Sequence, residues 1–302
     1  MLKTLANGQV WLVTQPDHGK IAGYLASHWG NRDFKRPGHY GSRADPERLR
    51  AEIVFAIAQH DNGWWEWEAA PDLSDVDGLP LGLAEVLKNP QEGMNRWRQG
   101  LRRFAESPYA NLLISRHAYW LYGARALPQP DPAFAHPLFW KGSPQRLYPG
   151  SLEEPLKFMA ELEQLQGPWI GCLQSDPETA CWTEPVNILP STRLLQICDG
   201  MSLALCSDLI PAKSGQTKGL GEDEFELHDV PRGGWNDRVT VRFTPRGQRR
   251  IEVSPYPFDI DPLPVVAPVT IMKPADEKPA YFQSWQQANI PQAVEFHYVS
   301  SV

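Results

Sequence analysis

His60 and Asp61 are neighbours whose side chains are both good ligands for a divalent metal ion, since such ions bind neutral imidazole nitrogen and carboxylate oxygen. They follow an apolar run in which Ile53, Ala56 and Ile57 recur at helical spacing. We therefore expect His60 on the buried face of a helix end. A buried imidazole beside a buried carboxylate is costly unless something binds the two. The pair thus predicts a metal site.

Three more candidate ligands lie on separate apolar segments. His18 comes one helical turn before Ile21, His117 comes one turn after Leu113, and Asp199 lies within a long apolar helical pattern. Because each segment offers one ligand, the four segments together predict a metal-binding constellation. The expected metal ligands are His18, His60, Asp61, His117 and Asp199.

Each candidate also has a purely structural interpretation. His60 could end its helix with the next carboxylate as a cap, and His117 could be a core histidine with its hydrogen bonds satisfied. Asp199 could form a buried ion pair with Arg193. These alternatives stay open at the level of the sequence.

The elements that must position these residues are mainly helices in the first part of the chain. Hydrophobic periodicity and capping residues predict helices over 18–29, 46–61, 83–88, 90–107, 110–122, 152–166 and 192–209. The last of these is apolar almost all round, so we expect it at the centre of the fold. A proline-rich connection near 124–151 joins the helices.

The C-terminal third changes character. Alternating or β-branched segments separated by Gly and Pro predict strands over 239–243, 250–254, 265–271 and 294–299, a pattern typical of an antiparallel sheet. An early strand at 9–14 is a candidate to join it. The expected fold class is mainly α: a helical core over 1–230 carrying an antiparallel β appendage over 231–302.

Composition limits the classes of partner. The chain has 302 residues, a formal net charge of −7 and a pI near 5.6, which argue against non-specific binding to nucleic acid or to acidic membranes. No apolar run reaches the roughly 18 residues that a membrane span needs. The four cysteines match no zinc spacing, so we expect free thiols and a cytoplasmic location. The expected partner is a small-molecule substrate.

The order of the candidate ligands resembles that of the HD superfamily of metal-dependent helical proteins. Its pattern is a histidine opening one helix, a His-Asp pair ending a second, and an aspartate in a late helix. His18, the pair His60-Asp61, and Asp199 follow this order, and His117 resembles the extra histidine of binuclear members. The resemblance implies an HD-like helical core with one or two ions of Fe, Mn, Zn or Mg.

The whole chain also resembles an uncharacterised bacterial family known only as a domain of unknown function. The matching phrases are Gln15-Pro16-Asp17-His18, His60-Asp61-Asn62-Gly63-Trp64, Ser107-Pro108-Tyr109-Ala110 and Pro255-Tyr256-Pro257-Phe258. This resemblance implies a fold and a metal site. It implies no reaction, because the family has no assigned activity.

One departure from the HD pattern concerns phosphate chemistry. Many HD phosphohydrolases place a lysine directly after the glycine that corresponds to Gly63, whereas this chain has Trp64. A tryptophan-rich stretch there suggests a pocket mouth lined by aromatic rings. Lys20 and Arg116 are the remaining candidate partners for an anion, and with Asp61 they form the expected catalytic set.

Three functions are compatible with these residues. The first is a metal-dependent hydrolase of HD type that cleaves a phosphoester with metal-activated water, with Asp61 bridging the ions in a binuclear version. The second is a di-iron oxygenase, which an aromatic and water-poor mouth would suit. The third is a non-catalytic, metal-containing binding protein.

Overall fold

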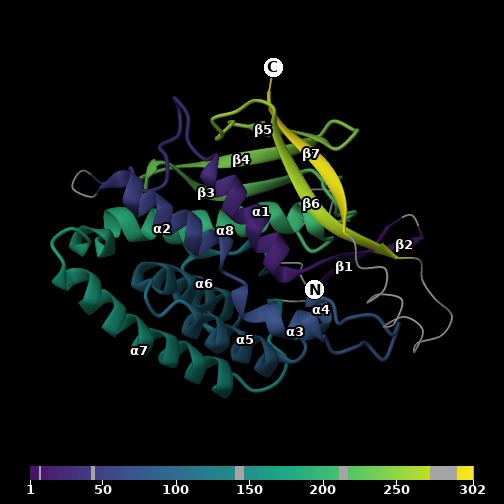
Figure 1. Cartoon of the computed structure of the whole chain (residues 1–302), viewed down its shortest axis with the longest axis horizontal. Helices are drawn as coiled ribbons and strands as arrows, with labels where there is room; N and C mark the ends of the chain where they lie inside the picture. The colour runs from purple at the N-terminus through teal and green to yellow at the C-terminus, as the bar shows by residue number, and fades with distance from the viewer. Residues whose placement is uncertain (7, 42–44, 140–145, 211–216, 273–290, 302) are drawn as a thin grey trace.

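A curled seven-stranded sheet arches over one long apolar helix, α8 (Pro185–Cys206), in the computed structural model of this chain (Figure 1). The structure describes residues 1–6, 8–41, 45–139, 146–210, 217–272 and 291–301. Residues 140–145 of the expected proline-rich connection lie outside the described part.

The helices begin where the sequence supplies caps and prolines. Thr14 accepts a hydrogen bond from the backbone of Asp17, and Asp45 caps the helix that starts with Pro46. Besides α8, the α-helices are α1 (Gln15–Ser27), α2 (Pro46–Ala58), α3 (Trp65–Ala69), α4 (Leu83–Val86), α5 (Pro90–Arg103), α6 (Pro108–Ala126) and α7 (Glu153–Ser175).

The sheet contains strands from both ends of the sequence. Its strands are β1 (Leu2–Ala6), β2 (Gln9–Val13), β3 (Phe225–Gly234), β4 (Asp237–Pro245), β5 (Arg250–Ser254), β6 (Leu263–Met272) and β7 (Gln292–Ser300). Their order is β1-β2-β6-β7-β5-β4-β3. The early strand does join the sheet, because Val10 pairs with Met272. All neighbouring strands are antiparallel except β5 and β7, which are parallel.

The expectation of a mainly α fold with a small antiparallel appendage is wrong. The molecule is 48% helical, and its mixed sheet covers 21% of the chain, so it is an α/β fold. The sheet was underestimated partly because β3 contains Pro231 and Gly234 and two register shifts, which obscure the alternation that marks a strand. The division near residue 230 stays a prediction.

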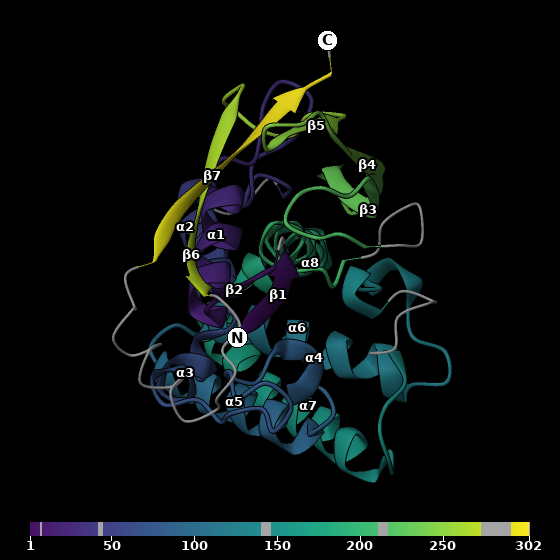
Figure 2. The ribbon, with the colours of Figure 1, turned by 90° about the vertical axis from the view of Figure 1, so that its right-hand side faces the viewer.

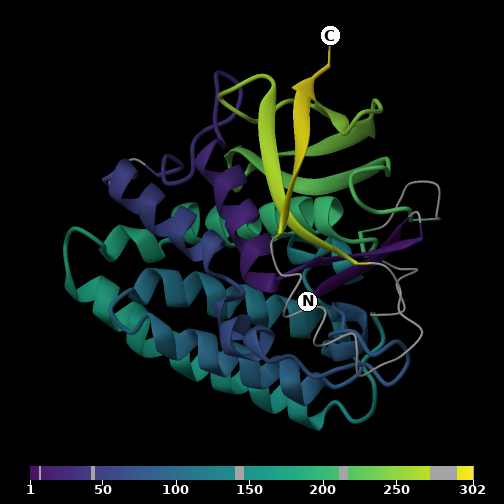
Figure 3. The same cartoon turned by 45° about the vertical axis from the view of Figure 1, so that its right-hand side comes forward.

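Helix α8 lies at the centre of the molecule, as its apolar sequence predicts. Nearly all of its side chains are buried. Figure 2 looks almost along α8 and shows β3 to β7 curving over it, while Figure 3 shows α8 running between the sheet and the helical layer below. The helix contacts α1, α6 and β3. A polar residue on α8 is therefore held in the interior.

Two glycines allow α1 and α2 to approach closely. A β-carbon on Gly23 would collide with the backbone and side chain of Ala58, and one on Gly19 would stand 3.1 Å from the carbonyl oxygen of Ala58. The missing β-carbons remove the atoms that would hold the helices apart. The close approach brings the start of α1 next to the end of α2.

Helix α2 ends at Ala58, so His60 and Asp61 lie in the turn that follows it and not in its last helical turn. A short 3-10 helix, Asn62–Trp64, comes next. Gly63 packs directly on α5, where a β-carbon would collide with the carbonyl oxygen of Arg96. The turn is thus held between α2 and the backbone of α5.

The helices also bear on the question of membranes. Among the described residues, no helix combines the length and the apolar character that crossing a bilayer requires.

Candidate metal centre

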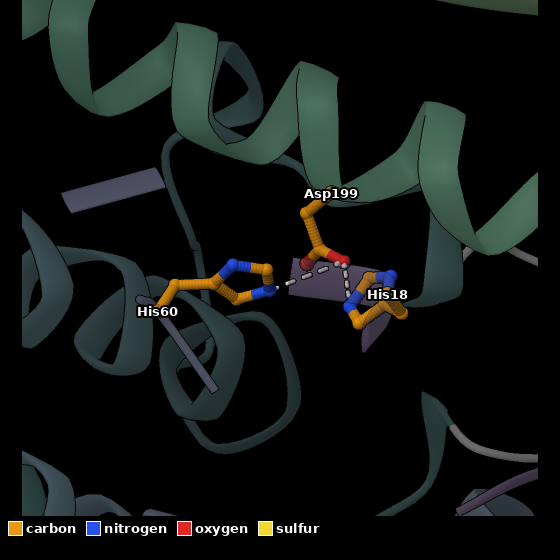
Figure 4. Close-up of side chains that lie close together, drawn as sticks. All are labelled: His18, His60 and Asp199. Carbon is orange, nitrogen blue, oxygen red and sulfur yellow. Dashed lines mark ion pairs between the residues drawn. The ribbon is translucent and has the colours of Figure 1, made fainter. Parts of the chain in front are cut away.

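Four segments bring the five expected ligands to one buried cluster. His18 lies in the first turns of α1, His60 and Asp61 follow α2, His117 lies in the middle of α6, and Asp199 lies in α8. All five side chains are buried. Figure 4 shows Asp199 projecting from α8 toward the rings of His18 and His60, which approach it from two sides.

The first half of the cluster joins two histidines and two carboxylates. His18 Nε2 lies 3.2 Å from Asp199 Oδ1 and 3.4 Å from Asp61 Oδ2. His60 Nε2 lies 3.7 Å from each of the same two oxygens. Donor atoms of His18, His60 and Asp199 all lie within 4.8 Å of one another.

The second half of the cluster consists of two histidines near the other carboxylate oxygen of Asp199, Oδ2. His117 Nε2 lies 3.2 Å from Asp199 Oδ2, and His136 Nε2 lies 3.0 Å from it. Asp199 therefore connects two groups of histidines, one through each oxygen. Asp61, which is expected to bridge the ions of a binuclear site, has its Oδ2 beside His18 and His60.

Hydrogen bonds fix the tautomers of two ligands. Ser202 Oγ donates to the carbonyl oxygen of Asp199, so it accepts from His18 Nδ1 at 2.6 Å. His60 Nδ1 donates to the carbonyl oxygen of Ile57 at 2.7 Å. Because both Nδ1 atoms carry a proton, each ring in its neutral form presents a lone pair on Nε2 to the cluster, the arrangement that metal-binding histidines use.

His136 has the opposite tautomer. Its Nδ1 accepts a hydrogen bond from the backbone N–H of Leu138 at 3.1 Å, which leaves the proton of the neutral ring on Nε2. That nitrogen is next to Asp199 Oδ2. His136 is therefore suited to orient the carboxylate by donating to it and not to bind a metal through Nε2.

The electrostatics of the cluster separate its histidines. Burial would lower the pKa of His18, but hydrogen bonding to Asp199 and Asp61 outweighs it and raises the pKa to about 9. Burial lowers the pKa of His117 to about 4, so this ring is neutral. Burial would raise the pKa of Asp199, but His136 and the other rings around it hold the pKa well below its ordinary range. Asp199 is thus an anion at neutral pH.

The donor atoms fit a cation. In the described part of the chain, His60 Nε2 and His117 Nε2 are buried and neither has a hydrogen-bond partner. Unpartnered buried acceptors are costly, and a metal ion would satisfy them together. Imidazole and carboxylate suit Zn, Fe and Mn alike, so the donors do not distinguish these metals. The buried cluster of His18, His60 and Asp199 could bind a metal ion.

A pocket opens onto the cluster. His18, Asp61, His117 and Asp199 lie on its wall. The rest of the wall is mainly apolar and includes Trp64, Val86, Trp97, Leu121, Leu138 and Phe139. Such a combination, a few polar groups in an apolar cavity, is typical of small-molecule sites.

The two expected anion partners are not brought to this cluster. Lys20 lies on the exposed side of α1 and pairs with Asp17. Arg116 donates from Nε to Thr192 Oγ1, about two turns along α8 from Asp199. Neither of them lies among the described residues that line the pocket.

Two residues of the site were missed at the sequence level. His136 lies in the proline-rich connection and is not among the expected ligands, although its neighbours Phe134, Leu138 and Phe139 signal burial. Arg125, which lies on the pocket wall, was not considered. It lies eight residues after His117, a spacing that puts both on one face of a helix.

Comparison with known proteins gives one match. A family model described as a protein of unknown function (DUF3891) matches residues 1–274. No curated protein and no solved structure matches the chain. The comparisons therefore identify no activity and give no support for the HD resemblance.

Proposed function

We propose that this chain, which belongs to the DUF3891 family of proteins of unknown function, is a metal-dependent hydrolase of a small molecule. The observation that carries the proposal is the carboxylate of Asp199, set between histidines at the wall of an apolar pocket. The order His18, His60-Asp61, Asp199 along the chain, which resembles the HD pattern, supports the same conclusion.

Each ligand has a place in this proposal. His18, His60, Asp61 and Asp199 would hold a divalent ion, and His117, which is near the other oxygen of Asp199, would be available to a second ion. A bound divalent ion lowers the pKa of a coordinated water toward neutrality and polarises the bond to be cleaved. Among the hydrolase substrates, we favour a phosphoester with an apolar organic part, because the pocket wall is apolar.

The protein's own groups would manage the proton and the water. Asp61 lies on the pocket wall, where its carboxylate can accept a proton from the attacking water. His136 Nε2 orients the carboxylate of Asp199, and Ser202 Oγ orients the ring of His18 through Nδ1. The tryptophan and leucine side chains of the wall exclude bulk water, which strengthens the electrostatic interactions inside.

The test is metal-dependent turnover. Protein loaded with Mn, Fe, Zn or Mg is assayed against a panel of phosphoesters and carboxylic esters, with Asp199→Asn as the disabled variant and His39→Ala as control. His39 pairs with Glu47 at the surface and is not part of the cluster. Turnover that depends on metal and is lost in Asp199→Asn supports a hydrolase. No turnover by protein shown to contain metal contradicts it.

A second candidate is an iron-dependent oxygenase, which the apolar wall with Trp64, Trp97 and Phe139 favours. Its test is oxygen uptake by protein loaded anaerobically with Fe(II), followed by Mössbauer spectroscopy for coupled iron. Oxygen uptake without ester turnover would favour this candidate over the hydrolase. Bound metal with neither activity would indicate a binding protein.

A further inference from the structure

Arg125 is a charged side chain on the pocket wall without a charged partner. It is the only lysine or arginine among the described residues that line the pocket. In the described part of the chain, no carboxylate forms an ion pair with it. Its Nε is buried and makes no hydrogen bond. A partly buried guanidinium with a free N–H group is costly unless a ligand pairs with it.

The surroundings of Arg125 hold its guanidinium in one orientation. The group stacks over the rings of Phe139 and Tyr148, with centroid distances of 5.3 Å and 4.9 Å. One Nη donates to the carbonyl oxygen of Leu147 at 3.1 Å. Aromatic stacking leaves the edge of a guanidinium free to donate hydrogen bonds. The side chain is therefore ordered before any ligand arrives.

Helix α6 sets the distance between this charge and the candidate metal centre. His117, Leu121 and Arg125 follow one another at four-residue intervals, and all three line the pocket. Eight residues of α-helix span about 12 Å. An apolar stretch of wall that includes Leu121 thus separates the ligands from the guanidinium.

We propose that the pocket takes an elongated, mainly apolar molecule that ends in a carboxylate, with the carboxylate bound to Arg125. The opposite end reaches the cluster of Asp199 and its histidines, and this part of the inference rests on the proposed function. Arg125 is then the residue that selects the substrate by its charge and length. Arg125 would then bind the anion, in place of Lys20 and Arg116, which are expected to do so from the sequence.

The charge balance favours a carboxylate over a phosphate monoester at this end. One guanidinium matches the single negative charge of a carboxylate and can donate two parallel hydrogen bonds to it. A phosphate dianion would leave a negative charge unmatched against an apolar wall. In the described part of the pocket no second cation is present to balance it.

The experiment measures binding by isothermal titration calorimetry on the full chain. The probes are decanoate, its uncharged analogue decanamide, and decyl phosphate. The variants are Arg125→Gln, which removes the charge, and Arg125→Lys, which keeps the charge without the planar fork. The matched control is Arg102→Gln, since Arg102 is an exposed arginine on α5.

Decanoate should bind the wild type and Arg102→Gln equally. Its affinity should fall about tenfold or more in Arg125→Gln, from the loss of a charge-assisted hydrogen bond, and by less in Arg125→Lys. Decanamide should bind wild type and Arg125→Gln alike, which also shows that the variant is folded. The proposal is overturned if decanoate does not bind the wild type, or if Arg125→Gln binds it equally well. Tighter binding of decyl phosphate than of decanoate would overturn the choice of a carboxylate.

The same titrations on protein dialysed against EDTA separate this inference from the proposed function. Arg125-dependent decanoate binding that persists without metal places the carboxylate at Arg125 and not on the ion. If the cluster binds no metal but this dependence remains, the proposed function is wrong and the inference about Arg125 stands. If metal binds but decanoate binding does not depend on Arg125, the inference about Arg125 is wrong and the proposed function is decided by its own turnover assay.

Discussion

Gly23 of α1 lies directly against Ala58 of α2, with no room for a methyl group between them. This contact determines how close His18 and His60 lie, because His18 is a little over a turn before Gly23 and His60 is two residues after Ala58. Their ring centroids are 5.0 Å apart. The distance between two candidate ligands is therefore set by backbone packing outside the site itself.

A methyl group at this contact should damage both stability and metal binding. Gly23→Ala would force α1 away from α2, and overpacking of this kind costs about 1–3 kcal/mol of unfolding free energy. Urea unfolding and metal titration measure the two effects. The matched control is Gly171→Ala in α7, where a β-carbon meets no atom within 4 Å. There we expect a gain of about 0.5–1 kcal/mol, because alanine favours a helix over glycine. Metal affinity unchanged in Gly23→Ala would contradict the role of the contact.

Removal of a ligand should remove the metal. His60→Ala takes away one of the buried donors, so metal affinity should fall at least about tenfold, a loss comparable to that from altering outer-shell partners. Metal content after dialysis, measured by mass spectrometry, reports it. His39→Ala should keep the wild-type content, because His39 pairs with Glu47 at the surface. Equal metal content in the two variants would argue against the site.

His117 and His136 should differ, although both touch the same oxygen of Asp199. Among the described residues no hydrogen bond commits either ring nitrogen of His117, whereas the N–H of Leu138 puts the proton of the neutral His136 ring on Nε2. If two ions bind, His117→Gln should lower the metal-to-protein ratio, and His136→Gln, which keeps a donor at that place, should leave it unchanged. A lowered ratio in His136→Gln alone would reverse the assignment.

Ser202 should tune the affinity without being a ligand. Its hydroxyl accepts from His18 Nδ1 and so holds the ring with Nε2 toward the cluster. Loss of such a partner typically weakens metal binding by about 10–100-fold. We expect Ser202→Ala to do this with little change in fold. Ser191→Ala is the control, because Ser191 is equally buried on α8 but donates to the carbonyl oxygen of Asn187 and not to a candidate ligand. Similar affinities in the two variants would rule out the positioning role.

Metal affinity should rise with pH. Hydrogen bonding to two carboxylates raises the pKa of His18 to about 9 in spite of its burial, so at neutral pH a metal ion must displace a proton from this ring. Calorimetric titrations should therefore show increasing affinity from pH 6.5 to about 9. The stability of metal-free protein should change in the opposite sense. A raised pKa contributes stability that is complete below about 6.5 and is lost as the pH rises through about 9. An affinity that does not vary over this window would contradict the prediction.

The sequence predicted the helices that carry the ligands better than it predicted the sheet. Periodicity and caps placed α2 and α6 to within about four residues at each end, since a long helix repeats its apolar face many times. The predicted start of α8 is about seven residues late, because Pro190 lies inside that helix. The strand predicted over 250–254 coincides with β5, Arg250–Ser254. β3 was missed because its bulges break the period on which strand prediction depends, and the parallel pairing of β5 with β7 is not visible in local sequence.

The candidate site shows a similar limit. Asp199 could be predicted as a ligand because a buried carboxylate needs a partner, and its burial follows from the apolar helical pattern around it. His136 and Arg125 could not be assigned in the same way. His136 reaches the cluster from an irregular segment, and the function of Arg125 depends on a cavity that only the packed helices create. Sequence periodicity carries information about faces of helices but none about cavities.

The curled sheet over α8 has a consequence for exchange of backbone amides with solvent. Asp199 belongs to a helix enclosed by strands on one side and helices on the other, so its amides can reach solvent only when the whole fold opens. A ligand that binds only the folded protein raises the cost of that opening. Occupancy at Asp199 should therefore slow deuterium uptake along the entire length of α8, well beyond the turn that carries the carboxylate.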